Sequence, residues 1–461
     1  MAAEPMRIRQ VNTFDRGGGA ESVVSRLHGE YRRRGHEALL SVKRRRGGAD
    51  GVSEIDETLG HGAWAGSLLK LSRRPGEETG RPLGAGAWAT GLRALARPRA
   101  ALERWCGWED FRFASSRHLA AWGDQPPDVV QCHNLHGNYF DLGALAELSR
   151  SLPVVLTLHD CWLLSGHCAH SFDCERWKTG CGSCPDLSIY PAIRRDASAY
   201  NWRRKRDIFR RGRLYVAAPS EWLMARVEKS ILMEGAVETR VIPNGIDDAF
   251  FADVDAARAR RTLGFEDDAV VLLFVANSIR GNEWKDFAML KESAMRLADL
   301  LADRRVHLVA LGEGGEDEPL GNGSIRFVPF IDKPALVAAY YQAADVYLHA
   351  ARVETFSLTI AEAMACATPV VAADTGAVAE RIVDLNDADS DTATGIMVAA
   401  ADARAMTEAT ARLLGDTDLR RRLGANGRQR ALRDYRTARQ AEAYLNWFAD
   451  IVDSRPKEAS P

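Results

Sequence analysis

The sequence predicts an α/β protein with two doubly wound domains, each a mostly parallel sheet between layers of helices. Short apolar runs alternate with segments of helical spacing from residue 6 onward, which is typical of βαβ units. The same alternation restarts after the turn signal Pro243-Asn244-Gly245. A chain of 461 residues is also too long for one ordinary core. We therefore place the first domain at residues 1–245 and the second at residues 246–435.

Strands are expected where apolar residues cluster between turn signals. In the first domain these runs are 6–13, 38–42, 128–130, 153–157, 214–217 and 239–242. In the second they are 269–276, 306–311, 325–328, 346–348 and 369–372. Residues 44–110, with frequent Gly, Pro and Arg, are expected to form a mobile, partly helical excursion. Residues 436–461 are expected to hold a helix at 438–452, which crosses back to the first domain, and a disordered tail.

The composition, 46% hydrophobic and 27% charged, is that of a soluble globular protein. No apolar run approaches the ~18 residues that a membrane-spanning helix needs. Near the start of the chain, Glu4 is acidic where a signal peptide would have basic and then apolar residues. These features predict a cytoplasmic protein. The first 250 residues are basic and the rest are acidic. This asymmetry favours an anionic acceptor or a membrane surface, or it marks only a solvated basic face. No nucleic-acid partner is expected.

The most informative stretch begins at Glu354, in the loop that follows an expected strand. An apolar helix is predicted to start near Ser357, and Glu362 lies about one turn into it. The start of a helix presents unpaired backbone N–H groups and a partial positive charge, which suits a diphosphate. Two flanking carboxylates can accept hydrogen bonds from sugar hydroxyls.

This stretch, with Ala-Met-Ala and Pro-Val-Val after Glu362, resembles the Glu, seven residues, Glu motif of the retaining family 4 glycosyltransferases. The resemblance implies the GT-B fold, in which two Rossmann-like domains face a central cleft. It implies that Glu354 contacts the transferred sugar and that Glu362 contacts the nucleotide ribose. It also implies that the N–H groups of Phe356, Ser357 and Leu358 hold phosphate or sugar.

Three positions depart from the glycines that this family often has: Thr355, Ser357 and Ala367. Thr355 and Ser357 can still donate their backbone N–H groups. A Cβ makes a left-handed conformation costly, so the alanine at 367 argues against a positive φ at that position.

Two further segments resemble donor-binding elements of the family. Gly18 and Gly19 follow the first strand, where missing side chains let N–H groups approach the donor phosphate, although glycines at such turns also serve packing alone. In the second domain the family's lysine is present as Lys285, but the Gly-Arg pair that usually follows the strand is missing. Arg280 is a candidate for the missing charge; the alternative is a solvated surface arginine.

Polar residues also follow two expected strands of the first domain. His133, Asn134 and His136 follow one strand, and His159 and Asp160 follow the next. Ligands of doubly wound folds bind at the carboxyl ends of the strands, so these residues are candidates for the acceptor side. They resemble the subgroup of the family that builds capsule and exopolysaccharide repeat units. In the family the histidine after this strand touches the transferred sugar. His159 is therefore the second catalytic candidate, after Glu354.

The chain has four closely spaced cysteines, Cys168, Cys174, Cys181 and Cys184, the last two in a Cys-x-x-Cys knuckle. Four thiolates in so short a loop can close a tetrahedral structural zinc site, and the same segment recurs in the resembling subgroup. Unbound or redox-active thiols are the alternative. Cys161, His167 and His170 are possible alternates as ligands.

The resemblance implies retaining transfer from a nucleotide-diphosphate sugar to a glycan, a lipid-linked or a small-molecule acceptor. No catalytic metal is expected, because the Asp-x-Asp sequences at 387–389 and 416–418 lie in polar stretches. The basic segment 203–213 is a candidate for peripheral contact with the inner face of the membrane, or it is a solvated helix. The alternatives to a transferase are a GT-B nucleotide-sugar epimerase, a sugar phosphorylase and a non-catalytic sugar-nucleotide-binding protein.

Overall fold

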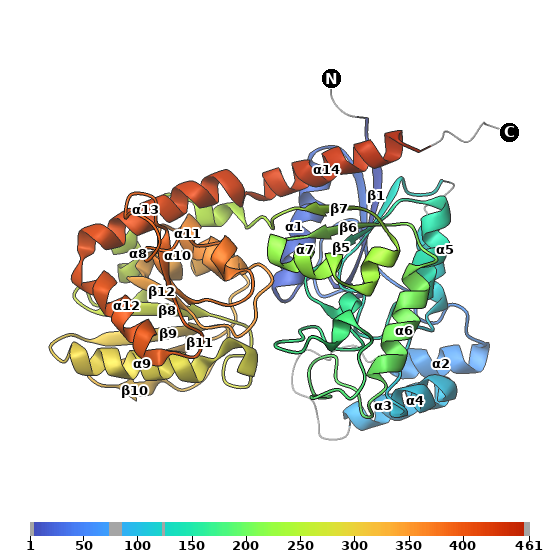
Figure 1. Ribbon diagram of the computed structural model, residues 1–461, viewed down its shortest axis with the longest axis horizontal. Coiled ribbons are helices and arrows are strands. Elements are labelled where there is room, and N and C mark those ends of the chain that lie inside the picture. Colours follow the sequence, from blue (N-terminus) through green and yellow to red (C-terminus); the bar gives the residue numbers. More distant parts are fainter. Residues whose placement is uncertain (1–3, 73–84, 122–124, 456–461) are drawn as a thin grey trace. The chain divides into compact units, whose positions relative to one another are not determined.

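A computed structural model describes residues 4–72, 85–121 and 125–455 (Figure 1). The chain forms two compact units. The first unit contains the chain up to Ala218, Leu223–Val241 and the chain from Tyr444 onward; the second contains Pro219–Trp222 and Ile242–Ala443. The predicted tail after 455 lies outside the described residues. Within the described residues, no helix combines the length and the apolar character that crossing a bilayer requires.

The first unit contains a seven-stranded parallel sheet with the order β3-β2-β1-β4-β5-β6-β7. Its strands are β1 (Arg7–Phe14), β2 (Glu37–Arg44), β3 (Val52–Glu54), β4 (Val129–Cys132), β5 (Val154–Thr157), β6 (Leu214–Ala218) and β7 (Ala236–Val241). Its helices are α1 (Gly19–Arg33), α2 (Ala63–Ser72), α3 (Ala85–Ala96), α4 (Pro98–Trp105), α5 (Gly143–Ser151), α6 (Ser198–Phe209) and α7 (Glu221–Glu228), whose first two residues group with the second unit.

The second unit contains a sheet with the order β10-β11-β9-β8-β12-β13-β14, in which only β10 is antiparallel to its neighbour. Its strands are β8 (Val270–Val275), β9 (Val306–Leu311), β10 (Glu318–Leu320), β11 (Gly323–Val328), β12 (Val346–His349), β13 (Val370–Ala373) and β14 (Gly395–Val398). Its helices are α8 (Ala256–Leu263), α9 (Phe287–Leu300), α10 (Pro334–Ala343), α11 (Leu358–Ala365), α12 (Ala403–Gly415), α13 (Thr417–Asp434) and the start of α14 (Thr437–Asp453).

Burial on both faces explains why the strands of the second unit read as continuous apolar runs. Along β8, Leu272 and Phe274 belong to one core cluster, together with residues of α9 and α12. Val271 and Leu273 point to the opposite face and belong to a second cluster with residues of α10 and α11. Successive side chains of a strand alternate between faces, so a sheet covered on both sides needs apolar residues at every position.

The last helix, α14, supplies core side chains to the first unit. Phe448 and Trp447 are fully buried. The Phe448 ring lies 6.1 Å from that of Tyr31 on α1, and the Trp447 ring lies 6.1 Å from that of Tyr215 on β6.

The structure confirms the predicted α/β architecture, and every predicted strand is present with small shifts at its ends. Three short strands were not predicted: β3, β10 and β14. All three lie at the edges of their sheets. β3 and β10 are three residues long and contain polar residues, which an edge strand tolerates, and β14 is an apolar run of only four residues. The predicted excursion contains β3 and the helices α2 to α4.

The expectation against a positive φ at Ala367 was wrong. Ala367 has a φ of +58°. Its N–H donates to the carbonyl of Met364 at 3.0 Å, and Thr368 N–H donates to the carbonyl of Ala363 at 2.9 Å. These two bonds form the Schellman motif that ends α11, and this motif requires a left-handed residue after the helix. The hydrogen bonds therefore hold Ala367 in a conformation that its Cβ disfavours.

Replacing Ala367 with glycine is expected to stabilise the second unit by about 1 kcal/mol, because the left-handed penalty disappears. The measurement is urea unfolding. Ala363→Gly, within the same helix, is the matched control and should destabilise by about 1 kcal/mol or more. Equal effects of the two substitutions on stability would contradict the left-handed conformation assigned to Ala367.

Candidate functional site

Two loops at the carboxyl edge of the second sheet bring Lys285 and Glu354 together. Lys285 follows β8 and Glu354 follows β12, and these strands are neighbours. The Lys285 ammonium donates to Glu354 Oε2 at 3.1 Å. The loops are also joined through the main chain, because Arg352 N–H donates to the carbonyl of Trp284 at 2.8 Å. The sequence predicted both residues for the donor site but not that they form an ion pair.

His349, the last residue of β12, is a neighbour of this pair that sequence reasoning missed. Its Nε2 lies 3.6 Å from Glu354 Oε2. Burial lowers the pKa of His349 to about 4; Glu354 opposes this effect and Lys285 adds to it. The imidazole is therefore neutral near pH 7. Its position at the end of the strand before Glu354 is the signal that could have found it.

The main chain at Glu354 is held from two sides. Its carbonyl accepts a hydrogen bond from Ala377 N–H at 2.9 Å, and a Cβ on Gly376 would lie only 2.2 Å from the same oxygen. The next carbonyl, that of Thr355, accepts from Ser220 Oγ at 2.7 Å. Gly376, with a φ of +56°, is therefore required for this close approach.

The start of α11 lies where the sequence predicts it. Ser357 caps the helix with a φ of +64°, and its Oγ accepts from Ile360 N–H at 3.4 Å. Glu362, in the middle of the helix, accepts a hydrogen bond from Tyr341 Oη at 3.0 Å. The Phe356 side chain is buried beneath the Arg381 guanidinium, so only the main chain of Phe356 is a candidate for ligand contact. Leu358 is the first residue of the helix.

Arg280, predicted to supply charge to the donor site, makes other contacts in the structure. Its guanidinium lies 3.4 Å from Glu313 Oε1 and stacks over the ring of Phe327 at 4.0 Å. Lys285, not Arg280, contacts Glu354. The assignment of Arg280 to the donor therefore stays a prediction.

In the first unit, Gly18 and Gly19 form the turn between β1 and α1, as the sequence predicts. Gly18 is the N-cap and Gly19 the first helical residue. A Cβ on Gly18 would lie 3.2 Å from a carboxylate oxygen of Glu21, in the first turn of the helix. An acidic residue at this position is favourable for the helix dipole.

The predicted acceptor-side residues cluster at the carboxyl ends of the neighbouring strands β4 and β5. His133 Nδ1 lies 3.0 Å from His159 Nε2, with the two rings stacked. Burial lowers the pKa of His159 to about 4 and that of His133 well below its usual value. Both rings are therefore neutral near pH 7, and a single proton can be shared between the two facing nitrogens. The main chain of Asn134 joins the cluster, since its carbonyl accepts from Thr13 Oγ1 at 3.1 Å.

A second contact pair lies beside these rings. His136 Nε2 is 3.0 Å from Asp160 Oδ2, and His136 Nδ1 is 3.1 Å from Tyr190 Oη. Burial alone would raise the pKa of Asp160, but its electrostatic interaction with His136 and the hydrogen bonds from the His136 ring and Trp162 N–H lower it. The carboxylate therefore stays ionised. Sequence reasoning missed Tyr190, which comes from a loop with no local motif.

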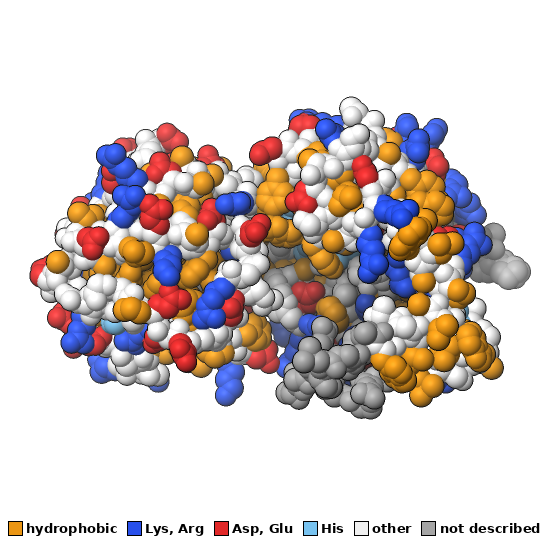
Figure 2. Space-filling view, turned by 90° about the horizontal axis from the view of Figure 1, so that it is seen from below, with side chains coloured by type: hydrophobic (Ala, Val, Ile, Leu, Met, Phe, Trp, Pro, Cys, Tyr) orange, Lys and Arg blue, Asp and Glu red, His pale blue; other side chains and the backbone are white. Residues whose placement is uncertain are grey.

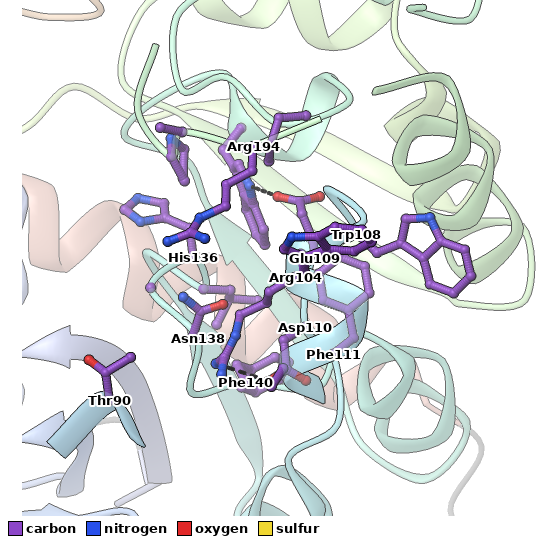
Figure 3. A pocket seen from close by; sticks show the side chains of 18 of the residues that line it. Thr90, Arg104, Trp108, Glu109, Asp110, Phe111, His136, Asn138, Phe140 and Arg194 are labelled. Carbon is purple, nitrogen blue, oxygen red and sulfur yellow. Dashed lines mark hydrogen bonds and ion pairs between the residues drawn. The ribbon is translucent and has the colours of Figure 1, made fainter. Parts of the chain in front are cut away.

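His136 also lines a cavity of about 440 Å³ in the first unit (Figure 3). We call it the aromatic pocket, because its walls include the side chains of Trp105, Trp108, Phe111, Phe140 and Trp162. One side of the pocket is formed by α3, α4 and the segment after α4, which belong to the excursion whose role the sequence did not reveal; the rest comes from the loops after β4 and β5.

The four predicted zinc ligands lie around one small cavity. Cys168, Cys174, Cys181 and Cys184 line it together with His167, whose Nε2 is 3.3 Å from Cys184 Sγ. Among the described side chains, however, no three of the His, Cys, Asp and Glu type form a group arranged to hold a metal ion.

The basic segment 203–213 is less available to an outside partner than its sequence suggests. Lys205 is fully buried, with its ammonium 2.9 Å from Glu109 Oε2. Arg206 and Arg210 both pair with Glu234, and Arg204 stacks on Phe111. Much of this charge therefore serves the packing of α6.

Two parallel-sheet units with polar sites at the carboxyl ends of their strands define the GT-B class of fold. A family model described as "Glycosyltransferase Family 4" matches residues 17–250, and one described as "Glycosyl transferases group 1" matches residues 269–416. The chain belongs to glycosyltransferase family 4.

Two curated relatives illustrate the range of similar proteins. The colanic acid biosynthesis glycosyl transferase WcaC of Escherichia coli is 29% identical over 269 residues, which cover 55% of this chain and 62% of that protein. D-inositol 3-phosphate glycosyltransferase 1 of Catenulispora acidiphila is 32% identical over 278 residues, which cover 56% of this chain and 58% of that protein. The chain thus spans about three fifths of the length of each relative.

Solved structures share the fold across nearly the whole chain. Sucrose-phosphate synthase from Thermosynechococcus elongatus has a TM-score of 0.62 at 17% identity, with 97% of this chain and 99% of that one covered. Anabaena HepE in complex with UDP-glucose has a TM-score of 0.55 at 18% identity, with 98% of this chain and 100% of that one covered.

Replacing Lys205 with Met is expected to destabilise the first unit by about 3–5 kcal/mol, because Glu109 loses the cation that offsets its burial. Burial already raises the pKa of Glu109, and loss of Lys205 raises it further. Stability that depends on a protonated carboxyl is present at low pH and is lost as the pH rises through the raised pKa. The deficit should therefore be largest at neutral pH.

Urea unfolding between about pH 5 and pH 7 measures this dependence. The double variant Glu109→Gln/Lys205→Met is the control and should recover the part of the lost stability that depends on pH. A deficit of the same size at every pH would contradict the pairing.

Proposed function

We propose that the protein is a retaining glycosyltransferase that moves a sugar from a nucleotide-diphosphate sugar to a hydroxyl acceptor. The observation that carries this proposal is the Lys285–Glu354 pair beside the start of α11, in a chain of family 4. A fixed cation and the first N–H groups of a helix suit the diphosphate, and the carboxylate suits the sugar hydroxyls.

The residues proposed to bind the nucleotide-sugar donor all lie in the second unit. Glu354 contacts the transferred sugar, Glu362 the ribose, and the main chain of Phe356, Ser357 and Leu358 the phosphate or sugar. Lys285 stabilises the charge that develops on the departing diphosphate. The similar Anabaena HepE has been solved in complex with UDP-glucose, which supports a nucleotide-sugar donor.

The residues proposed to bind the acceptor lie in the first unit. The facing rings of His133 and His159 and the pair of His136 with Asp160 gather polar atoms where an acceptor hydroxyl can be oriented. Both curated relatives are named as glycosyl transferases, which favours transfer over epimerisation or simple sugar-nucleotide binding. The colanic acid relative supports a role in polysaccharide biosynthesis.

The transfer is proposed to need no catalytic metal, because Lys285 and the start of α11 provide the positive charge that a metal would otherwise supply. One carboxylate of the Asp-x-Asp sequences has a structural role that supports this view, because Asp416 caps α13 by accepting from Leu419 N–H at 2.9 Å.

We also propose a cytoplasmic location with peripheral membrane contact. The sequence pointed to the basic segment 203–213 for this contact, whereas the surface proposed here is formed by α2, α3 and α4. These helices expose large apolar side chains: Trp64 (66%), Leu71 (57%), Trp88 (51%), Leu95 (60%), Leu102 (61%) and Trp105 (48%). In Figure 2 orange side chains gather at the lower right, over these helices. Exposed tryptophans on helices that also carry exposed cations, such as Lys70 and Arg99, are typical of a surface that lies in a membrane interface.

A structural zinc ion is proposed for Cys168, Cys174, Cys181 and Cys184. The support is that all four line one cavity and that the knuckle between the last two is strained. Cys181, Gly182 and Ser183 have φ values of +55°, +89° and +47°. Such a run persists only where its surroundings hold it, and a zinc ion about 2.3 Å from each sulfur would do so. When bound, it would supply folding free energy rather than chemistry.

The purified protein is expected to contain about one equivalent of zinc, because tetrahedral thiolate sites bind the ion tightly. Elemental analysis and melting with and without chelator measure this. Cys181→Ser should lose the metal and the chelator sensitivity, whereas Cys366→Ser, at a buried cysteine of the second unit, should keep both. Less than about half an equivalent, with no effect of chelator, would refute the proposal.

Glu354→Gln is expected to lower sugar transfer by about 100-fold or more, because the amide cannot replace the carboxylate facing the sugar and Lys285. The donor is first identified as the nucleotide sugar that raises the melting temperature most, since binding appears as stability. Release of nucleoside diphosphate from that donor then measures turnover.

Glu408→Gln, at an exposed carboxylate of α12, is the matched control and should keep full activity. Unchanged melting of Glu354→Gln shows that the fold is intact. Full activity in the Glu354 variant would remove the basis of the catalytic assignment.

A further inference from the structure

The aromatic pocket combines apolar walls with a small number of charged groups. Trp108 stacks on Tyr200, with ring centroids 4.5 Å apart, and Arg195 stacks on Trp105 at 3.5 Å, so both indoles are held in place. Fixed aromatic walls suit the C–H faces of a sugar ring. The volume of about 440 Å³ lies within the range of small-molecule sites.

The two acids of the pocket each have a cation of their own. Glu109 pairs with the buried Lys205 at 2.9 Å, and its Oε1 also accepts from Trp162 Nε1. Asp110 Oδ2 lies 2.9 Å from Arg97, whose side chain is only 11% exposed. Neither carboxylate therefore presents an uncompensated negative charge to a ligand.

Two arginines remain as surplus positive charge. Arg104 approaches Asp110 only at 3.8 Å, on the oxygen that Arg97 already contacts. Among the residues that the structure describes, no carboxylate lies within ion-pair distance of Arg194, which is exposed at the rim. Figure 3 shows both side chains at the cavity, with the Arg194 guanidinium reaching toward His136.

A second cavity of about 120 Å³ shares Arg104 and Asn138 with the aromatic pocket. It is lined by Lys43, Arg93 and Arg97, with Glu57 as its acid. Burial, together with Arg93, lowers the pKa of Lys43 to about 8. Burial and a neighbouring cation both disfavour the charged form of Lys43, so an anion bound in this cavity would stabilise that charge.

We propose that the aromatic pocket binds a phosphorylated sugar, with its ring against the indole walls and its phosphate between Arg104 and Arg194. Both cations line the same cavity and suit a phosphate, because guanidinium groups bind phosphate oxygens through paired N–H groups. The proposal rests on the proposed function and names the class of its acceptor. His136 places this pocket next to the carboxylate of Asp160.

The same chemistry has two possible sources, a soluble sugar phosphate and the headgroup of a lipid-linked phosphate. Trp105 both lines the pocket and belongs to the exposed apolar surface of α2 to α4. A lipid-linked phosphate held at that surface would lie directly beside the pocket. The experiment therefore has one arm for each source.

The first arm measures binding by calorimetry with glucose 1-phosphate, mannose 1-phosphate and myo-inositol 1-phosphate, each beside the unphosphorylated compound. The second measures sedimentation with phosphatidylcholine vesicles, with and without polyprenyl phosphate. The variant is Arg104→Gln/Arg194→Gln, and Arg150→Gln, at an exposed arginine in the last turn of α5, is the matched control. Nucleoside diphosphate binding is measured for every protein.

At least one phosphorylated probe should bind the wild type at least about tenfold more tightly than its unphosphorylated form, with tighter binding at low salt. The double variant should lose this preference, while Arg150→Gln keeps it. Binding only to vesicles with polyprenyl phosphate, again dependent on the two arginines, identifies the lipid-linked source.

The proposal is overturned if no phosphorylated probe is preferred, or if the double variant binds as well as the wild type. Nucleoside diphosphate binding reports on the second unit. Its retention in the double variant, with turnover lost in Glu354→Gln, would show that the transferase function stands even where the acceptor class is wrong.

Discussion

Parallel pairing of the strands is the constraint on which both candidate sites depend. When neighbouring strands run in the same direction, the loops that follow them all emerge at one edge of the sheet. In the second unit β8 and β12 are neighbours, so loops about 70 residues apart in sequence place Lys285 against Glu354. In the first unit β4 and β5 are neighbours, and His133 faces His159 for the same reason.

Burial then sets the charge state of these groups. His133, His159 and His349 lie where desolvation lowers the pKa of the ring, so they are neutral hydrogen-bonding groups near pH 7. Asp160 keeps its charge because His136 and Trp162 N–H stabilise the carboxylate. In the first unit the neutral rings of His133 and His159 can accept or donate a hydrogen bond but carry no extra proton to transfer near pH 7.

The excursion between β3 and β4 adds a different surface to an otherwise regular sheet and its helices. Its helices α3 and α4 and the segment after them form one side of the aromatic pocket, while α2, α3 and α4 expose indole and leucine side chains. Lys205 connects this excursion to the rest of the unit, because its ammonium reaches Glu109 from α6 and also donates to the carbonyls of Trp162 and Ser165. The shape of the pocket therefore depends on a buried ion pair.

Local patterns in the sequence were enough to predict the α/β architecture, the glycine turn before α1, the start of α11 and the residues at the strand ends. They succeed because hydrophobic periodicity and turn chemistry act over a few residues. Only the tertiary structure decided the partners: Lys285 with Glu354, His349 beside them, Tyr190 with His136, and Lys205 with Glu109. It also decided that Ala367 adopts a positive φ, because the hydrogen bonds at the end of α11 outweigh the cost of one Cβ. Contacts between distant segments depend on strand order and burial, which no local spacing encodes.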